Sequence, residues 1–156
     1  EGGGLGANPT LTVGEWQTVE ASEVEVYCIS DLHCDYTLNL AWTEALPFPE
    51  EGEGSAMRVL LLAGDLATDL AILERCLLGL KKRFDEVLFV PGNHEAWVSR
   101  GSDAPMGSAP DSFTKLNEVL AVCDKCGVRT APLTVSLPPR PPRAESAAGE
   151  GEAGEG

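Results

Sequence analysis

The sequence MRVLLLAGD, at residues 57–65, sets the predicted fold because an unbroken apolar run is followed at once by a glycine and a carboxylate. An apolar run of this length is typical of a strand covered on both faces of a parallel sheet. Two further apolar runs end in the same way. Residues 24–30 lead into SDLH at 30–33, and residues 86–90 lead into PGNHE at 91–95. The sequence therefore predicts three strands that each end on polar side chains.

These polar side chains have the chemistry of a metal site. In open α/β sheets the binding crevice lies outside the carboxyl ends of the strands, so we expect them to converge there. They are Asp31, His33, Asp65, Asn93 and His94. Carboxylates and imidazoles bind divalent transition metals at about 2.0–2.2 Å. Asp31 and His33 are two residues apart, so in extended backbone they share a face and can reach one ion.

Each of the three motifs also has an ordinary structural interpretation. Asp-x-His is common, Gly-Asp after a strand is often only a turn, and Asn-His before a helix can be only a cap. The order of all three motifs, each directly after a predicted strand, favours a metal site over three unrelated turns.

Helices are predicted between the strands. A helix capped by Thr37 is expected to run to about Leu46, and a helix capped by Asp69 should follow the second strand. A third helix begins at Asp111 or Ser112 as its cap. The predicted buried faces are Leu38, Ala41, Trp42 and Ala45 in the first helix, Leu70, Leu73, Leu77 and Leu80 in the second, and Phe113, Leu116, Val119, Leu120 and Cys123 in the third.

Weaker strand signals flank this core. Residues 11–19 form a possible edge strand, and residues 128–137 a fourth strand interrupted at Pro132. Acidic residues 50–55 and Gly/Ser/Pro-rich residues 101–110 are expected to be loops. The alternation of strands and helices predicts an α/β fold with a parallel sheet.

Composition excludes several classes of protein. With 156 residues, a single domain is expected. The net charge of −14 argues against a nucleic-acid or anionic-membrane surface, which needs clustered Lys and Arg. No apolar stretch approaches the roughly 20 residues that cross a bilayer. The oligomeric state stays open.

The five cysteines do not form a recognisable disulfide framework, because their number is odd and they are scattered. A reducing, intracellular compartment is therefore expected, with the cytoplasm as first choice. Cys123 and Cys126 have CxxC spacing but no second ligand pair, so we interpret them as part of a helix that ends at Gly127.

The three motifs in this order resemble the calcineurin-like metallophosphoesterase superfamily over about residues 24–98. The resemblance implies an α/β/β/α sandwich and a centre of two divalent ions, Mn, Fe or Zn. It implies that Asp31 and His33 bind the first ion, Asp65 bridges both and Asn93 binds the second. His94 would be the catalytic group at the phosphoryl or leaving oxygen.

The resemblance also implies hydrolysis of a phosphate ester by a metal-activated hydroxide, with a phosphorylated small molecule or phosphoprotein as partner. Glu95, which directly follows His94, is expected to orient that imidazole.

The superfamily pattern continues with another His and then Gly-His-x-His, whereas this chain has only two histidines, His33 and His94. We therefore interpret residues 22–137 as the N-terminal half of the domain, with the second half of the sandwich missing. Residues 1–21 are expected to be partly disordered and residues 138–156, rich in Pro, Gly and Glu, disordered. Two alternatives stay open: a non-catalytic binding or regulatory module with at most one weak cation site, and a plain structural α/β domain without metal.

Overall fold

The computed structural model describes residues 15, 17–46, 56–98 and 108–139. The predictions for residues 1–14, for the acidic loop at 50–55, for residues 101–107 and for residues 140–156 lie outside this part. The elements in chain order are β1 (Gln17–Glu20), β2 (Glu23–Ile29), α1 (Thr37–Ala45), β3 (Ala56–Ala63), α2 (Leu70–Lys81), β4 (Glu86–Val90), α3 (Ser112–Cys126) and β5 (Leu133–Ser136).

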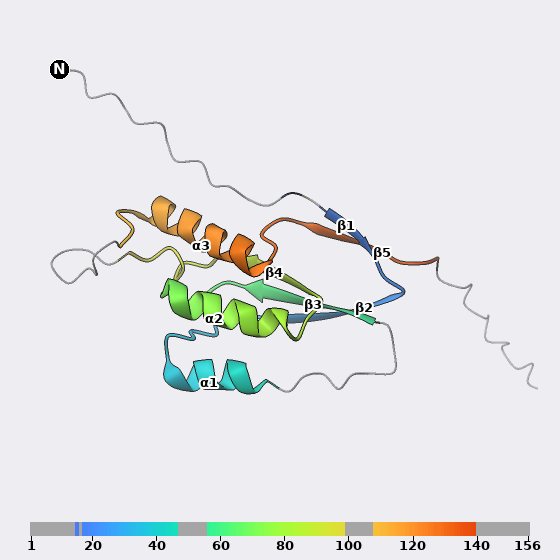
Figure 1. Ribbon diagram of the computed structural model, residues 1–156, viewed down its shortest axis with the longest axis horizontal. Helices are drawn as coiled ribbons and strands as arrows, with labels where there is room; N and C mark the ends of the chain where they lie inside the picture. The colour runs from blue at the N-terminus through green and yellow to red at the C-terminus, as the bar shows by residue number, and fades with distance from the viewer. Residues whose placement is uncertain (1–14, 16, 47–55, 99–107, 140–156) are drawn as a thin grey trace, which may run out of the picture.

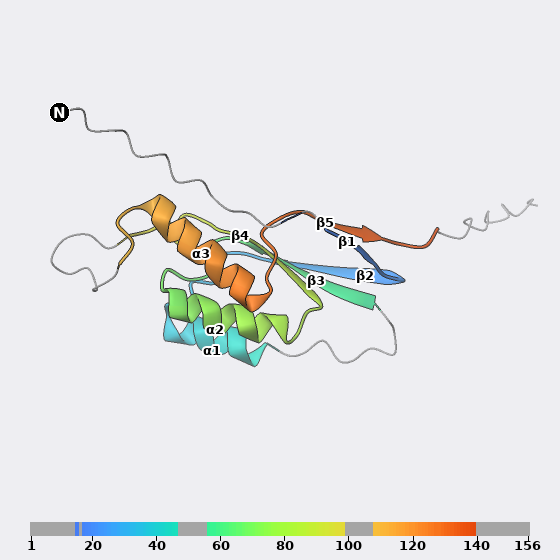
Figure 2. The same ribbon diagram turned by 45° about the horizontal axis from the view of Figure 1, so that its top comes forward.

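The three predicted strands form one parallel sheet in the order β2-β3-β4. Ile29 pairs with Leu62, and Ala63 pairs with Val90, so the carboxyl ends of the strands are level with one another. This register brings the three polar motifs to one edge of the sheet. Helices α1, α2 and α3 lie on one side of that sheet, while β1 and β5 form a separate pair beyond β4 (Figures 1 and 2).

The predicted fourth strand is split where Pro132 interrupts it. Before the proline, the Phe89 N–H donates to the Arg129 carbonyl and the Arg129 N–H to that of Val87, each at 2.8 Å. After the proline, the chain moves away from β4, and β5 pairs in parallel with β1. A proline has no N–H to continue a ladder, which explains why the strand changes partner there.

The face of the sheet under the helices forms the core. The side chains of Leu60, Leu62, Val87 and Phe89 are buried there. The predicted stripe of α2 is confirmed, since Leu73, Leu77 and Leu80 are buried and Leu70 packs against them. On α3, Val119, Leu120 and Cys123 are buried, but the prediction for Phe113 is wrong because that ring is exposed.

Caps fix the ends of α2 and α3. The Asp69 carboxylate accepts the N–H groups of Ala71 and Ile72, as predicted. Between the two candidates for α3, Asp111 is the cap, and the Thr114 N–H that it accepts lowers the pKa of its carboxyl group. Gly127 ends α3 with a φ of +67°, in the left-handed region that favours glycine.

The predicted face of α1 is wrong. Leu38 and Trp42 are exposed, while Leu40 packs on the core and Thr43 is buried. Thr37 is the first helical residue rather than the cap, which is Tyr36 without a side-chain bond. Polar contacts, rather than the apolar side chains of α1, determine which face of this helix is turned toward the core. Arg83 donates to the carbonyls of Thr43 and Glu44, and the Thr43 hydroxyl shares a hydrogen bond with the Cys34 thiol.

The opposite face of the sheet is only partly covered within the described residues, although Val59 is buried there. Val26 is 59% exposed, Leu61 36% and Val90 69%. In the described part of the chain, the prediction that β3 is covered on both faces therefore holds at Val59 and is wrong at Leu61.

All five cysteines are free thiols, as expected. In the part of the chain that is described, none of the helices has the length and apolar character needed to span a bilayer.

Candidate metal centre

Backbone hydrogen bonds fasten the end of β2 to the end of β3. The Asp31 N–H donates to the Gly64 carbonyl at 3.2 Å, and the His33 N–H donates to the Asp65 carbonyl at 2.9 Å. One step further, the Cys34 N–H donates to the Leu66 carbonyl at 2.7 Å. The chain thus continues pairing past the strand ends and holds the first motif beside the second.

Backbone strain is concentrated at this edge. Among the described residues, positive φ angles outside glycine occur at Asp31 (55°), His33 (44°) and Asp65 (55°). Each such conformation costs about 1–3 kcal/mol and persists only where the surroundings enforce it. All three are residues that the sequence predicts as metal ligands, so the strain coincides with the candidate site.

Three side chains from the three motifs meet. The candidate ligand atoms of His33, Asp65 and His94 all lie within 4.8 Å of one another. Asp31 is adjacent, with its Oδ1 atom 3.9 Å from Nε2 of His33. Ligands of one ion at about 2.0–2.2 Å lie no more than about 4.4 Å apart, so the cluster is near the size that a shared ion requires.

The other predicted ligand, Asn93, is exposed in the same turn, next to His94. The structure therefore brings His33, Asp65 and His94 together, with Asp31 beside His33, while Asn93 directly precedes His94 in the turn after β4. Sequence reasoning gave His94 a catalytic role, and its position within the cluster also makes it a possible ligand.

The two imidazoles and an indole form a continuous aromatic contact. The ring centroids of His33 and His94 are 4.4 Å apart at 66°, and those of His94 and Trp97 are 3.7 Å apart at 32°. Such contacts restrict the orientation of the His94 ring between its two neighbours. Sequence reasoning placed Trp97 after the motif and gave it no role.

Glu95, the residue after His94, is fully buried. Its Oε1 atom accepts the N–H groups of Leu66 at 2.6 Å and Ala67 at 3.0 Å. Its Oε2 atom accepts those of Asp65 at 3.0 Å and Gly92 at 2.7 Å. One carboxylate thereby joins the turn after β3 to the turn after β4.

The expectation that Glu95 orients His94 is replaced by this role. A carboxylate has about four acceptor positions, and four backbone N–H groups occupy those of Glu95. His94 is held instead through its backbone, because its N–H donates to Oδ1 of Asp65 at 3.0 Å. The position of Glu95 directly after His94 does not show, from sequence alone, whether its carboxylate bonds the imidazole ring or backbone N–H groups.

Gly64 and Gly92 are required because the turns after β3 and β4 lie too close together for a side chain at either position. A Cβ atom on Gly92 would lie 2.2 Å from Oδ1 of Asp65, and one on Gly64 would lie 2.9 Å from Cα of Gly92. Gly64 also has a φ of +79°. The absence of these two side chains lets the turns after β3 and β4 touch.

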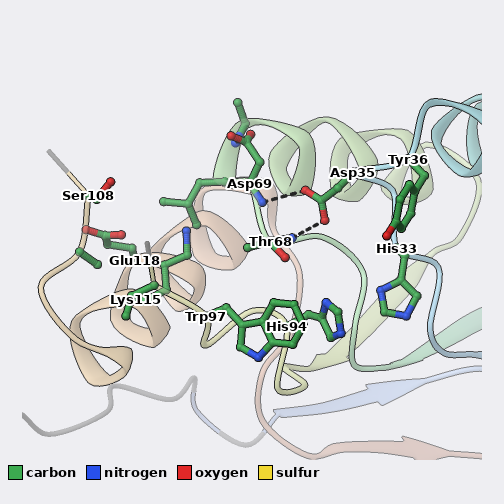
Figure 3. Close-up of a pocket in the computed structure, with 14 residues that line it drawn as sticks. His33, Asp35, Tyr36, Thr68, Asp69, His94, Trp97, Ser108, Lys115 and Glu118 are labelled. Atoms are coloured by element: carbon green, nitrogen blue, oxygen red, sulfur yellow. Dashed lines mark hydrogen bonds between the residues drawn. The ribbon is translucent and has the colours of Figure 1, made fainter. Parts of the chain in front are cut away.

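Asp35 performs a similar task in the first motif. Its carboxylate accepts the N–H groups of Thr68 at 2.7 Å and Asp69 at 3.0 Å, which ties the end of β2 to the start of α2. These residues, together with His33, His94 and Trp97, line a pocket of about 640 Å³ (Figure 3). Sequence reasoning missed Asp35, although it lies two residues after His33.

Cys34 is not part of the cluster. It is fully buried, and its hydrogen bond with the Cys76 thiol lowers the pKa of Cys34 and raises that of Cys76. Cys123 is also buried, which raises the pKa of its thiol to about 12. The CxxC cysteines lie on α3 against the core, as the helix interpretation predicts.

A parallel α/β sheet with Asp and His side chains at the carboxyl ends of its strands offers the donors that a metal-dependent hydrolase requires. Residues 24–130 match the family described as calcineurin-like phosphoesterase, and the chain belongs to that family.

The chain is similar to the [acyl-carrier-protein] phosphodiesterase PptH of Mycobacterium tuberculosis (strain ATCC 25618 / H37Rv), at 30% identity over 118 residues. That match covers 75% of this chain and 33% of the relative. The crystal structure of phosphopantetheinyl hydrolase (PptH) from Mycobacterium tuberculosis matches with a TM-score of 0.53 and 28% identity, covering 78% of this chain and 38% of that one. The chain thus spans little more than a third of the relative that it matches.

Proposed function

We propose that this chain provides part of a divalent-metal centre that hydrolyses phosphoesters. The observation that carries the proposal is the meeting of His33, Asp65 and His94, which follow three adjacent strands. His33 and Asp65 also have strained backbone. Neutral imidazoles and a carboxylate are suitable donors for Mn²⁺, Fe or Zn²⁺. Family membership supports the reaction class.

Each residue has a distinct task in this proposal. Asp31 and His33 would hold a first ion, Asp65 would bridge it to a second, and Asn93 would contribute to the second. Bound ions of this kind supply Lewis-acid polarisation of the phosphoryl group and activation of water. Glu95 fixes the backbone of both turns, so that Asp65 is positioned before any substrate arrives.

His94 would act on the phosphoester itself. Its ring is wedged between His33 and Trp97, which limits its rotation. A protonated imidazole at this place can stabilise charge on a phosphoryl oxygen or donate its proton to the leaving oxygen. The contact from the His94 N–H to Asp65 couples its position to that of the bridging carboxylate.

A phosphodiester is the first substrate class to test. The matched relative is named as a phosphodiesterase and as a phosphopantetheinyl hydrolase. Phosphorylated small molecules and phosphoproteins are the broader class that the site chemistry accommodates.

The test is hydrolysis of bis-p-nitrophenyl phosphate by the complete protein with Mn²⁺. Asp65→Asn should lower kcat/KM by about 10³-fold, because a neutral amide cannot bridge two cations. The control is Asp124→Asn, which changes an exposed carboxylate at the end of α3 and should leave turnover unchanged. Chelation of the metal should abolish turnover in the parent protein. Equal turnover in the Asp65 variant would contradict the proposal.

One observation favours a second candidate, a binding module with a single weak cation site. Both histidines of the chain are already in the cluster, so no third imidazole is available from it. In that case calorimetry should detect one weak Mn²⁺ site and the phosphodiester should not turn over. Two tight sites would exclude this candidate.

A further inference from the structure

The pocket extends well beyond the metal cluster. Figure 3 shows His33 and His94 at one end, Trp97 beside them, and Lys115, Glu118 and Ser108 at the other end. Its volume is about 640 Å³. A phosphoryl group needs roughly 100 Å³, on the scale of about 30 Å³ for a water molecule. Most of the pocket is therefore available to the organic part of a substrate.

The charges along this pocket disfavour a second anion. Asp35, Asp69 and Glu118 line it, whereas Lys115 is the single lysine or arginine among the described residues that line it. Asp35 and Asp69 accept backbone N–H groups, which keeps their carboxylates in place. Bound metal ions would compensate charge only near His33 and His94. A group that extends toward α3 meets a net negative wall.

Trp97 offers the surface on which an extended group can lie. Its indole contacts the His94 ring, yet the residue is 53% exposed and lines the pocket. Leu70, Ala71 and Ala109 add apolar lining near it. A flat, amphipathic ring next to apolar side chains suits a chain of methylene and amide groups.

We propose that Trp97 and the α3 side of this pocket bind the organic arm of the substrate, and that this arm is extended and uncharged. The inference rests on the proposed phosphoester hydrolysis and names the class of substrate. Compact phosphoesters would leave the pocket empty, and arms with a second anionic group would meet Asp69 and Glu118.

The test uses three p-nitrophenyl phosphodiesters with the complete protein and Mn²⁺. The second ester group is methyl, a six-carbon chain ending in an amide, or the same chain ending in a carboxylate. The amide chain should exceed both others by about tenfold in kcat/KM, mainly through KM, as expected for contacts along a pocket. Equal values for the three diesters would overturn the inference while leaving the hydrolysis itself intact.

Substitutions of Trp97 test whether this residue causes the preference for the amide diester over the methyl diester. Trp97→Ala should reduce the amide-to-methyl ratio by about tenfold, and Trp97→Phe should retain most of it because a flat ring remains. The control is Trp42→Ala, since Trp42 is 50% exposed on α1 and outside the pocket. A ratio that Trp97→Ala leaves unchanged would contradict the assignment.

A failure of the proposed hydrolysis is recognisable separately. In that case none of the three diesters is hydrolysed, and the affinities of the intact diesters are measured by calorimetry instead of kcat/KM. Tighter binding of the amide diester that depends on Trp97 supports the inference. Equal binding of all three, or binding independent of Trp97, overturns it.

Discussion

Strand β4 has a carboxylate at its start and another shortly after its end, and the two are held by different means. Glu86 forms two hydrogen bonds with the Arg129 guanidinium, at 2.6 and 2.8 Å. Glu95 is fully buried and accepts four backbone N–H groups. The first carboxylate is paired with a counter-charge, whereas the hydrogen bonds of the second within the described residues come from backbone N–H groups.

This difference separates the structural end of the sheet from the functional end. At the amino end, the ion pair joins β4 to residue 129 with ordinary backbone geometry. At the carboxyl end, three positive φ angles and two close glycine contacts accompany Glu95. The N–H bonds to Glu95 fix the turns that carry Asp65 and His94, so the carboxyl end of the sheet holds its candidate ligands in place.

The largest expected effect on stability comes from removing the Glu95 carboxylate. Glu95→Ala leaves four N–H groups unpaired in the interior and should lower the free energy of unfolding by about 3–5 kcal/mol. Urea denaturation of the complete protein measures it. Glu95→Gln should also destabilise, since its NH₂ group faces two N–H donors. A loss within 0.5 kcal/mol, about the level of a surface substitution, would contradict the role of Glu95.

A smaller effect is expected from crowding the two turns. Gly92→Ala places a Cβ atom against Asp65 and should weaken Mn²⁺ binding about tenfold while costing about 2 kcal/mol of stability. Calorimetry and urea denaturation measure the two quantities. The matched control is Gly79→Ala on α2, where a Cβ meets nothing within 4 Å. That control should bind Mn²⁺ normally and gain up to about 1 kcal/mol. Identical Mn²⁺ affinities in both variants would contradict the claim that a Cβ atom at position 92 displaces Asp65.

The smallest effect is expected at the amino end of β4. Glu86→Gln removes the charge from a mostly buried ion pair but keeps an acceptor oxygen for Arg129, so it should cost about 1–1.5 kcal/mol. Mn²⁺ affinity should not change, because the pair lies at the opposite end of the strand from the cluster. A several-fold change in Mn²⁺ affinity would show that the two ends are coupled and would break the comparison.

The sequence predicted the strands and their polar ends because both signals are local. An apolar run such as 57–63 and a motif such as GNHE need no knowledge of the rest of the chain. The caps Asp69 and Gly127 were predicted for the same reason. Their chemistry is determined within one helical turn.

What the sequence missed depends on contacts between distant residues. The face of α1 was wrong because Arg83, far along the chain, bonds its last carbonyls. The role of Glu95 depends on amides near residue 66, which sequence proximity to His94 does not indicate. The covering of both faces of β3 was inferred from its composition, whereas Leu61 is partly exposed in the described structure.

The central claim is that the carboxyl ends of β2, β3 and β4 bind a divalent metal. Crystals of the complete protein grown with Mn²⁺ test it directly, through the anomalous scattering of the ion. The account predicts a peak about 2.0–2.4 Å from the Asp65 carboxylate and the His33 imidazole. A saturated crystal with no peak at this edge, or with Mn²⁺ bound there without Asp65, would contradict it.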